Sequence, residues 1–255
     1  MINKHINILI KRYKMTKPLL MSFDFDHTVI DKNSDIVIRE LLPNEYTETI
    51  KKLYKSCDGW TMLMKNIFEL LHSNKITKDE INDTINSIPA VQGFEEILKN
   101  LNSNNCEVII ISDSNSVFIE NWLKYRQLDH TVNKIFTNPA WFDDKNLLNI
   151  KPYHEQNWCT LSEKNLCKGY ILENYIKERT ENGVSFEKIA YAGDGKNDLC
   201  PILKLSDKDI AFPRQDYPII KLLNDPDTKN NVKAQVIPWK TGTDIWNALV
   251  NKINL

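Results

Sequence analysis

Short apolar segments that end in polar residues recur along the chain. Residues 19–23 form one such segment, followed by Asp24, and residues 106–111 form another, followed by Ser112. A short apolar run between polar residues predicts a strand that is buried on both faces, as in a parallel sheet. Further short strands are predicted at residues 134–137, 188–192, 209–212 and 235–237.

The segment between the first two predicted strands has a different pattern. Residues 45–54, 61–71 and 78–88 each carry apolar side chains at the spacing of an amphipathic helix. Thr77 followed by Glu80 is the signature of a capping box, which predicts that the third of these helices begins at this point.

Beyond the second predicted strand, strands and helices alternate, with helices expected at residues 165–179 and 244–253. This alternation predicts an α/β fold, a doubly wound, Rossmann-like parallel sheet with helices on both faces. The helical block interrupts the alternation. We therefore expect a small helical cap domain at residues 37–89, inserted into an α/β core formed by residues 19–36 and 90–255.

Composition and charge exclude several classes of protein. The 255 residues include 33 basic and 34 acidic side chains, so the formal net charge of −1 argues against nucleic acid as a partner. No apolar run reaches the roughly 18 residues of a membrane-spanning helix, so no membrane association is expected. The five cysteines form no Cys-x-x-Cys pair, and this odd set without a secretory signal favours the reducing cytoplasm.

Residues 1–18 differ from the rest of the chain because they carry lysine and arginine but no acidic residue. We expect them to form a disordered basic leader. A mitochondrial targeting segment is the alternative, although such segments are usually richer in Arg and Ser, and translation starting at Met15 is another.

Acidic residues follow three of the predicted strands. Asp24 and Asp26 follow the first, Asp113 the second, and Asp194 and Asp198 a later one. Ligands of open parallel sheets bind at the carboxyl ends of the strands, and carboxylates gathered there need a cation to offset their repulsion. Oxygen ligands favour Mg²⁺, which also shares phosphate oxygens of a substrate, so the pattern indicates phosphate chemistry.

Four segments resemble, in order, the motifs of the haloacid dehalogenase superfamily of phosphatases. They are Asp24-x-Asp26-x-Thr28, Ser112 after an apolar strand, Lys168 at a helix start, and Gly193-Asp194-Gly195-x-Asn197-Asp198. The helical block between the first two motifs resembles the inserted cap of that superfamily. The resemblance implies a phosphatase, a phosphoric monoester hydrolase.

A narrower resemblance extends over residues 19–250. The segments that carry it are residues 23–35, 111–115, 137–139, 152–154 and 165–168. They are similar to the phosphoethanolamine/phosphocholine phosphatase and pyridoxal phosphate phosphatase family. The substrate implied is therefore a small phosphorylated metabolite, with pyridoxal 5′-phosphate or phosphoethanolamine/phosphocholine as the first candidates. The oligomeric state is left open.

The resemblance also implies catalytic roles. Asp24 would be the nucleophile that forms an aspartyl-phosphate, because covalent catalysis splits one hard step into two. Asp26 would be the proton donor and then the proton acceptor, a role that requires acidic neighbours to raise its pKa. Ser112 and Lys168 would bind the phosphoryl oxygens and stabilise the charge of the transition state.

A Mg²⁺ cofactor is implied in the same way. The carboxylate of Asp24, the backbone carbonyl of Asp26 and the carboxylate of Asp194 would bind the ion. Asp198 would bind it through water or orient Lys168. Thr28 would hold the loop between these residues in shape.

Asp35 and Asp113 lie outside the generic motifs but near the same sheet edge. The family resemblance implies that both contact the substrate, and two carboxylates suit an ammonium group or the charged ring nitrogen of pyridoxal 5′-phosphate. Helix caps or solvated turn residues are the alternative at both positions. Tyr54 and Trp60 could pack against a quaternary ammonium through cation–π contacts, although such aromatics more often form the core of a cap.

Other functions stay open at this point. Pyrophosphate and thiamin monophosphate are alternative substrates. A receiver-type module that binds phosphate and Mg²⁺ without turnover is an alternative of another class, but such a module needs no acid/base group like Asp26 near the acceptor. His27, between the two aspartates, points away from them if the segment is extended.

The chain departs from the family in the segment before Lys168. Relatives have a His-x-His-x-Cys-x-x-Cys arrangement there, whereas Gln156 and Ser162 replace two of the potential ligands here. His154, Cys159 and Cys167 are retained, and three such ligands with a water can bind zinc. We favour a loop with buried thiols and no metal.

Overall fold

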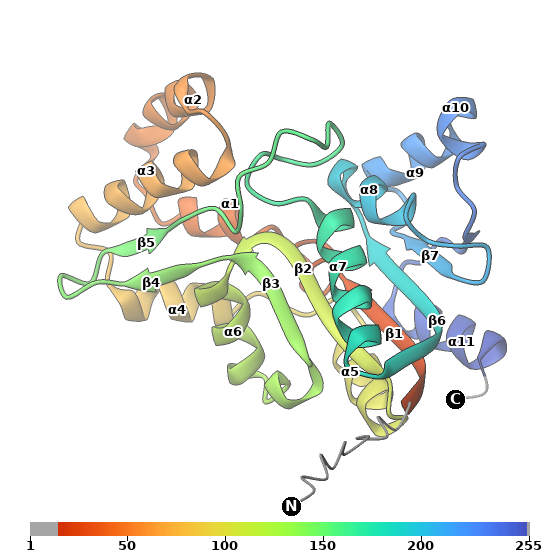
Figure 1. Cartoon of the computed structure of the whole chain (residues 1–255). Helices are drawn as coiled ribbons and strands as arrows, with labels where there is room; N and C mark the ends of the chain where they lie inside the picture. Colours follow the sequence, from red (N-terminus) through yellow and green to blue (C-terminus); the bar gives the residue numbers. More distant parts are fainter. Residues whose placement is uncertain (1–14, 254–255) are drawn as a thin grey trace, which may run out of the picture.

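The protein folds around one parallel sheet of six strands in the order β3-β2-β1-β6-β7-β8 (Figure 1). The computed structural model describes residues 15–253. The strands are β1 (Met15–Phe23), β2 (Glu107–Asn115), β3 (Lys134–Asn138), β6 (Val184–Gly193), β7 (Ile210–Pro213) and β8 (Gln235–Val236). Every strand predicted from an apolar run is present, and the chain runs outwards from β1 to both edges, so the predicted doubly wound sheet is confirmed.

The first strand begins four residues earlier than the apolar pattern predicts. Met15, Thr16 and Lys17 pair with Val184, Ser185 and Phe186 of β6. The boundary of the basic leader at residue 18 is therefore wrong, and its residues 1–14 lie outside the described residues. An apolar run cannot reveal this part of β1, because strand pairing uses the backbone and its first side chains are exposed.

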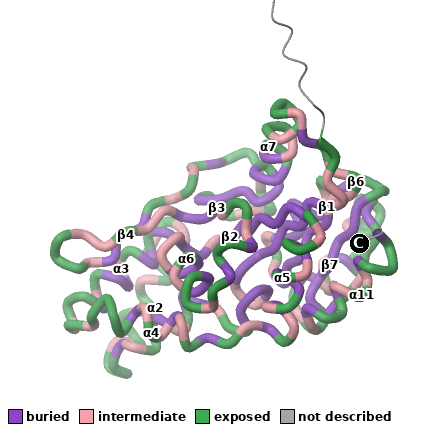
Figure 2. Tube along the Cα trace, turned by 90° about the horizontal axis from the view of Figure 1, so that it is seen from below, coloured by how far each residue is buried: buried purple, intermediate pink, exposed green. Residues whose placement is uncertain are grey.

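Helices cover both faces of the sheet, as predicted. Alternate residues of β1 belong to two separate apolar clusters, Leu19 and Met21 to one and Leu20 to the other. Helices α5 (Phe94–Ser103), α6 (Ser116–Tyr125) and α11 (Gly242–Lys252) cover the first face. Helices α7 (Lys168–Glu181), α8 (Leu199–Ile202) and α9 (Pro218–Asn224) cover the second, and α10 (Pro226–Lys229) follows α9. Buried residues accordingly concentrate in the central strands (Figure 2).

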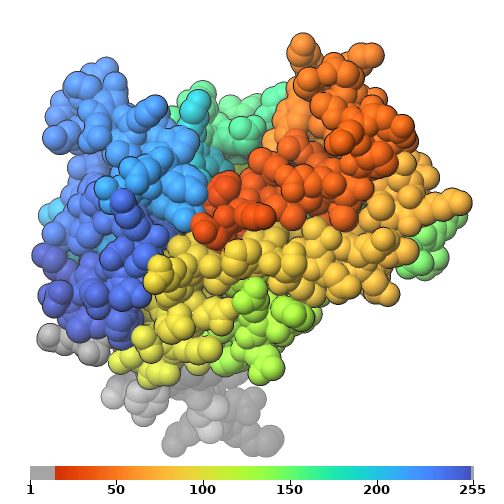
Figure 3. Space-filling model, turned by 180° about the vertical axis from the view of Figure 1, so that it is seen from behind, coloured from red at the N-terminus to blue at the C-terminus, as the bar shows by residue number. Residues whose placement is uncertain are grey.

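The insert between β1 and β2 is helical, as its spacing predicts. It contains α1 (Ser34–Arg39), α2 (Thr47–Ser56), α3 (Trp60–Ser73) and α4 (Lys78–Asn86). The predicted capping box begins α4, where Thr77 Oγ1 accepts a hydrogen bond from Glu80 N (3.2 Å) and Glu80 Oε2 accepts one from Thr77 N (2.8 Å). The space-filling view shows the orange and gold insert packed beside the yellow segment that contains α5 (Figure 3).

A short antiparallel hairpin, β4 (Ala140–Phe142) and β5 (Leu148–Ile150), projects from the edge of the sheet beside α3 (Figure 1). Buried Leu148 and Ile150 belong to the same apolar cluster as the buried face of α3. The sequence does not predict this hairpin, because each strand has only three residues and too few apolar positions to form a recognisable pattern. The hairpin leads the chain into the loop over residues 151–167.

Candidate active site

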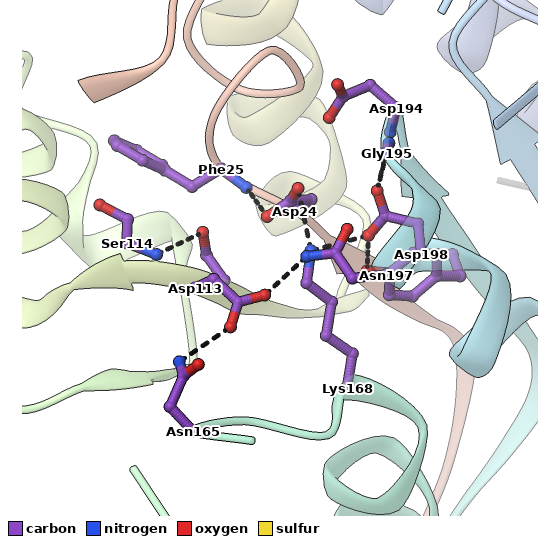
Figure 4. Close-up of polar contacts among 12 residues, drawn as sticks. Asp24, Phe25, Asp113, Ser114, Asn165, Lys168, Asp194, Gly195, Asn197 and Asp198 are labelled. Carbon is purple, nitrogen blue, oxygen red and sulfur yellow. Dashed lines mark hydrogen bonds and ion pairs between the residues drawn. The ribbon is translucent and has the colours of Figure 1, made fainter. Parts of the chain in front are cut away.

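The register of the sheet brings the predicted acidic residues to one edge. Phe23, the last residue of β1, pairs with Ile110 of β2 and Ala192 of β6. Asp24 N continues this pairing and donates to Ala192 O at 2.9 Å. Asp24 therefore lies between the ends of β2 and β6, where Asp113 and Asp194 are also found (Figure 4).

Lys168 lies at the centre of this edge and is fully buried at the first turn of α7. Its Nζ is 2.9 Å from Asp24 Oδ2 and 2.8 Å from Asp198 Oδ1 (Figure 4). Burial alone would lower the pKa of Lys168, but the carboxylates of Asp198, Asp24 and Asp113 outweigh burial and raise it. The ammonium of Lys168 therefore keeps its charge although it has no contact with solvent.

Asp198 is the most heavily hydrogen-bonded carboxylate of the site. Its Oδ1 accepts from Lys168 Nζ and from the Tyr191 hydroxyl (2.6 Å), and its Oδ2 accepts from the backbone N–H of Asp194 (2.9 Å) and Gly195 (2.8 Å). These donors use all the lone-pair positions of a carboxylate. Of the two roles that the resemblance implies for Asp198, these contacts support orienting Lys168.

Gly193 makes this packing possible. A Cβ at this position would lie 2.3 Å from Asp198 Cγ, so any side chain would push the carboxylate away from Lys168. The first glycine of the Gly193-Asp194-Gly195 segment is therefore required by the close approach of Asp198 to the backbone.

The carboxylates of Asp24, Asp194 and Asp198 offer oxygen atoms within 4.8 Å of one another. Burial, together with the neighbouring Asp198, raises the pKa of Asp24 to about 7 and that of Asp194 to about 9, although Lys168 opposes both shifts. The cluster thus holds more negative charge than Lys168 balances. A hard cation with oxygen ligands fits this donor set, with Asp24 and Asp194 as the carboxylates that have acceptor positions left.

Asp26 lies two residues beyond Asp24 and is half-buried. Its Oδ1 accepts a hydrogen bond from Ser34 N at 2.8 Å. Burial raises the pKa of Asp26 well above its usual value, and the carboxylates of Asp35 and Asp24 raise it further. The prediction that its neighbours raise this pKa is correct, but burial is the larger cause.

The hydroxyl residues of the first two motifs, Ser112 and Thr28, are both buried. Ser112 is buried at the end of β2, and its Oγ accepts from Ser114 N at 3.3 Å. Thr28 is buried, its N–H donates to Phe25 O at 3.2 Å, and its hydroxyl has no hydrogen-bond partner among residues 15–253. Thr28 thus belongs to the turn that returns the chain from Asp24 towards α1.

The backbone at His27 is not extended, so the condition under which its side chain would point away from the two aspartates is not met. His27 has φ of +54°, because the strand ends at Phe23 and the chain turns sharply. Its ring packs against Tyr217 with centroids 5.5 Å apart. Arg214, which the sequence analysis does not identify, holds this turn by donating to His27 O at 2.5 Å and to Asp31 at 2.6 Å.

Asp113 is held by amide side chains that the sequence analysis also does not identify as site residues. Asn165 Nδ2 donates to its Oδ1 at 3.0 Å, and Asn197 Nδ2 donates to its Oδ2 at 2.6 Å (Figure 4). Asn138, at the end of β3, donates to the backbone carbonyl of Asp113 at 2.7 Å. The signal was available, because all three asparagines lie in the segments that carry the family resemblance.

Asp35 connects the edge of the sheet with the helical insert. It is only 2% exposed, its Oδ2 accepts from Trp60 Nε1 at 2.6 Å, and its buried Oδ1 has no hydrogen-bond partner in the described part of the chain. Burial raises the pKa of Asp35 to about 7, opposed by the Trp60 hydrogen bond and reinforced by Asp113. Tyr54, by contrast, is exposed and hydrogen-bonded to Arg39, so its ring is already next to a cation.

A cavity of about 740 Å³ opens between α3 and the loop that follows β5. Residues from both sides line it, among them Trp60, Thr61, Lys65, Ile150, Pro152 and Asn165. Trp60 and Asn165 are also the residues that contact Asp35 and Asp113. Neither carboxylate lines the cavity, but each is hydrogen-bonded to a residue that does. The cavity therefore lies one side chain away from both carboxylates and can admit a small molecule.

Comparisons with known proteins agree with this geometry. Residues 19–253 match a family model described as "Putative Phosphatase". The chain is 36% identical to pyridoxal phosphate phosphatase PHOSPHO2 of Bos taurus over 235 residues, which cover 89% of this chain and 95% of the relative. It is 32% identical to the human phosphoethanolamine/phosphocholine phosphatase over 231 residues, covering 89% and 86% of the two chains.

The fold has solved counterparts as well. A phospho-aspartyl intermediate analogue of phosphoserine phosphatase superposes with a TM-score of 0.55 at 21% identity, over 91% of this chain and 99% of the other. No helix among residues 15–253 is long and apolar enough to cross a membrane. The chain belongs to the family of the phosphoethanolamine/phosphocholine and pyridoxal phosphate phosphatases, within the haloacid dehalogenase superfamily, and is a phosphatase.

Proposed function

We propose that this phosphatase hydrolyses small phosphomonoesters by a Mg²⁺-dependent reaction in which Asp24 forms an aspartyl-phosphate. The observation that carries the proposal is the buried Asp24–Lys168–Asp198 chain of ion pairs at 2.9 and 2.8 Å, with Asp26 two residues away. A nucleophilic carboxylate, a fixed ammonium and a carboxyl group with a raised pKa are the groups that this reaction requires.

In the first step an Asp24 oxygen attacks phosphorus while the bond from phosphorus to the ester oxygen breaks. Protonated Asp26 donates its proton to the leaving oxygen, so the alcohol departs neutral. In the second step ionised Asp26 accepts a proton from water, whose oxygen attacks phosphorus and releases Asp24 as a carboxylate. Lys168 and Ser112 bind the equatorial phosphoryl oxygens throughout and offset the charge of the transition state.

Asp24, Asp194 and the backbone carbonyl of Asp26 would bind the Mg²⁺. When bound, the ion would neutralise carboxylate and phosphate charge at the sheet edge. The raised pKa of Asp24 and Asp194 supports this assignment, because burial and then the neighbouring carboxylates disfavour their ionised forms, which a bound cation would stabilise. Asp198 acts by holding Lys168 towards Asp24.

The substrate is proposed to carry a positive charge or an N–H group near its phosphate. Asp35 supports this proposal, because its Oδ1 is buried without a partner and can accept from a ligand. Asp113 lies near enough to reinforce the charge of Asp35, and Trp60 presents an aromatic ring at the cavity. Pyridoxal 5′-phosphate, phosphoethanolamine and phosphocholine meet these requirements, and the first two relatives described above act on them by name.

We further propose that residues 37–89 act as a cap that excludes proteins and nucleic acids, and that the enzyme works in the cytoplasm. Thiamin monophosphate carries a cationic ring and is the alternative monoester, whereas pyrophosphate lacks any group for Asp35 to bind. A receiver-type module is disfavoured because it has no use for an acid/base carboxyl such as Asp26.

The experiment is phosphate release from a panel of these five compounds and a neutral aryl phosphate, with Mg²⁺ or with EDTA. We expect turnover of at least one cationic monoester with Mg²⁺ and none with EDTA. Re-addition of Mg²⁺ after EDTA should restore the rate, which controls for unfolding by the chelator. Binding of phosphate without turnover of any panel member would contradict the proposed enzyme and favour the receiver-type module.

A further inference from the structure

A cluster of three cysteines lies behind the active site, on the other side of the first turn of α7. The Sγ atoms of Cys159, Cys167 and Cys200 all lie within 4.8 Å of one another. Cys159 Sγ is 3.5 Å from Cys200 Sγ, and Cys167 Sγ is 3.8 Å from Cys200 Sγ. All three are free thiols that come from the loop before α7, from its N-cap and from α8.

We propose that Cys159, Cys167 and Cys200 bind a Zn²⁺ ion as thiolates, with the fourth coordination position directed at the Ser162 hydroxyl. Tetrahedral zinc with bonds of about 2.3 Å to sulfur requires its sulfur ligands to lie about 3.8 Å apart. The two sulfur–sulfur distances of the cluster match this edge. They are far longer than the roughly 2.05 Å of a disulfide.

Ser162 supplies the argument for the fourth position. Its hydroxyl lies beside the thiols of both Cys159 and Cys200. Its oxygen is buried and has no well-formed hydrogen bond within residues 15–253. Thiols are weak hydrogen-bonding partners, so an ion or an ion-bound water at this position would satisfy the buried hydroxyl better than the two neighbouring sulfur atoms do.

The loop before α7 is folded in a way that holds the cluster together. Buried Gln156 donates through Nε2 to the carbonyls of Cys159 (3.0 Å), Ser162 (3.3 Å) and Glu163 (2.9 Å), and its Oε1 accepts from Cys159 N at 2.8 Å. One amide side chain therefore fixes both Cys159 and Ser162. Gln156 is not itself a zinc ligand, but its hydrogen bonds hold the loop in the conformation that places Cys159 and Ser162 at the proposed zinc site.

The ligand set differs from the one considered from sequence, which comprised His154, Cys159 and Cys167. His154 Nε2 accepts a hydrogen bond from Cys167 N at 2.9 Å, so this nitrogen is engaged with the backbone. Cys200 takes its place, although it is far away in the sequence. Gly169 permits this approach, because a Cβ there would lie 2.5 Å from Cys200 Sγ.

The cluster is accessible from the surface. A cavity of about 370 Å³ is lined by the three cysteines together with Trp158, Leu161 and Tyr170. Zinc can therefore enter without unfolding the protein. Sulfur ligands select zinc and oxygen ligands select magnesium, so the two clusters would not compete for one ion.

The position of the cluster indicates a structural role. Cys167 directly precedes Lys168, and Cys200 follows Asp198 by two residues. A zinc ion would link the start of α7 to α8 and so stabilise the positions of Lys168 and Asp198 relative to each other.

The first test is the zinc content of the full chain, purified without chelators and washed with excess Mg²⁺. We expect about one tightly bound Zn²⁺ per chain, as in other structural zinc sites. Cys159→Ser should lower the affinity for zinc at least about tenfold, because a thiolate ligand is lost. The matched control is Cys57→Ser, a half-buried cysteine outside the cluster, which should keep the zinc of the wild type.

Two further measurements test whether the metal binds to the cysteines and not to the carboxylates, and whether an effect of mutation reflects misfolding. Co²⁺ bound to the wild type should show the thiolate-to-cobalt charge-transfer absorption of a sulfur site, and Asp194→Asn should retain it. In the unmutated protein, added zinc should slow alkylation of Cys159, Cys167 and Cys200 but not of Cys57, as read by peptide mass spectrometry. Neither readout depends on phosphatase activity.

Ser162→Cys tests the fourth position by gain of function. A fourth thiolate should tighten zinc binding about tenfold or more relative to the wild type, whereas Ser162→Ala should not. Zinc content unchanged by Cys159→Ser, or a Cys159–Cys200 disulfide with no zinc uptake in the reduced protein, would overturn the proposal. Equal zinc affinity in Ser162→Cys and wild type would overturn the assignment of the fourth position.

Discussion

The catalytic and substrate-facing parts of the active site are held in different ways. On the catalytic side, Asp198 is fixed by Lys168, a tyrosine hydroxyl and two backbone N–H groups, and all its acceptor positions are used. On the substrate-facing side, Asp35 accepts one indole N–H from the helical insert, and its other oxygen has no hydrogen-bond partner among residues 15–253. The protein itself fills the acceptor positions of Asp198, whereas Asp35 has an acceptor position left for a ligand.

This difference teaches how one site can keep its chemistry while its substrate changes. The groups proposed to transfer phosphate are fixed by backbone and buried charge at the end of the sheet. The groups proposed to recognise the rest of the substrate are held by side chains from the insert and from two loops. Changes in the second set can alter selectivity without disturbing the first.

The largest effect should come from Asp24→Asn. Loss of the nucleophile should lower kcat by on the order of a thousandfold or more for every substrate, because no aspartyl-phosphate can form. Phosphate release and the mass of the trapped phosphoenzyme measure the two consequences. The variant keeps the acceptor for Phe25 N, so its circular dichroism should match the wild type. Normal turnover by this variant would refute the proposed covalent mechanism.

The next effect in size is expected for Asp26→Asn, which should lower kcat by about a hundredfold to ten-thousandfold because it removes the acid/base group. The loss in the first step should be smaller for an aryl phosphate with an acidic leaving group, which departs without a proton. Rates for a series of aryl phosphates measure this dependence. A loss that is the same for good and poor leaving groups would argue against proton donation by Asp26.

The catalytic side is also the part that sequence predicts well. Asp24 and Asp194 directly follow strands, with Asp26 and Asp198 a few residues further on. Parallel strands bring their carboxyl ends together whatever lies between them in the sequence. The hydrogen bond between Trp60 and Asp35 could not be predicted in this way, because it depends on how the insert packs on the sheet. The same limit applies to Cys200, whose distance from Cys159 depends on the packing of α8 against α7.

The pattern of apolar residues also fails to predict features that depend on backbone pairing or backbone conformation. Met15 and Thr16, the first residues of β1, are exposed, yet they pair with β6. His27 has a left-handed backbone at a turn stabilised by Arg214, which follows β7 and is distant in the sequence. Neither feature produces an apolar period, so only the arrangement in space reveals it.

A smaller and selective effect is expected at the substrate-facing side. Asp35→Asn should lower kcat/KM for a cationic substrate by about tenfold, the range of one charge-assisted hydrogen bond, and leave the neutral aryl phosphate nearly unchanged. Asp113→Asn should act in the same direction, because its charge reinforces that of Asp35. The ratio of kcat/KM for the two substrates is the measurement. Equal losses for both would remove the idea of cation recognition.

The smallest effect should be that of Asp35→Asn on the stability of the fold. The pH dependence of this effect tests whether burial destabilises the ionised form of Asp35. Its pKa is raised from 3.8 to about 7, chiefly by burial, with Asp26, Asp113 and Arg39 as the charged groups around it. The folded state therefore binds this proton more tightly than the unfolded state. Stability from this group is present below pH 4 and is lost as the pH rises towards 7.

Asp35→Asn keeps an acceptor for Trp60 but carries no charge at any pH. We therefore expect its Tm to exceed that of the wild type at pH 8 and to approach or fall below it at pH 5, measured without ligand. Asp58→Asn is the control, because this aspartate of the same insert is exposed and should show no such trend. A Tm difference that stays constant from pH 5 to pH 8 would mean that Asp35 is not strained by its burial. In that case the free oxygen of Asp35 would give no reason to expect a cationic ligand. The proposed difference between Asp198 and Asp35 would then have no energetic basis.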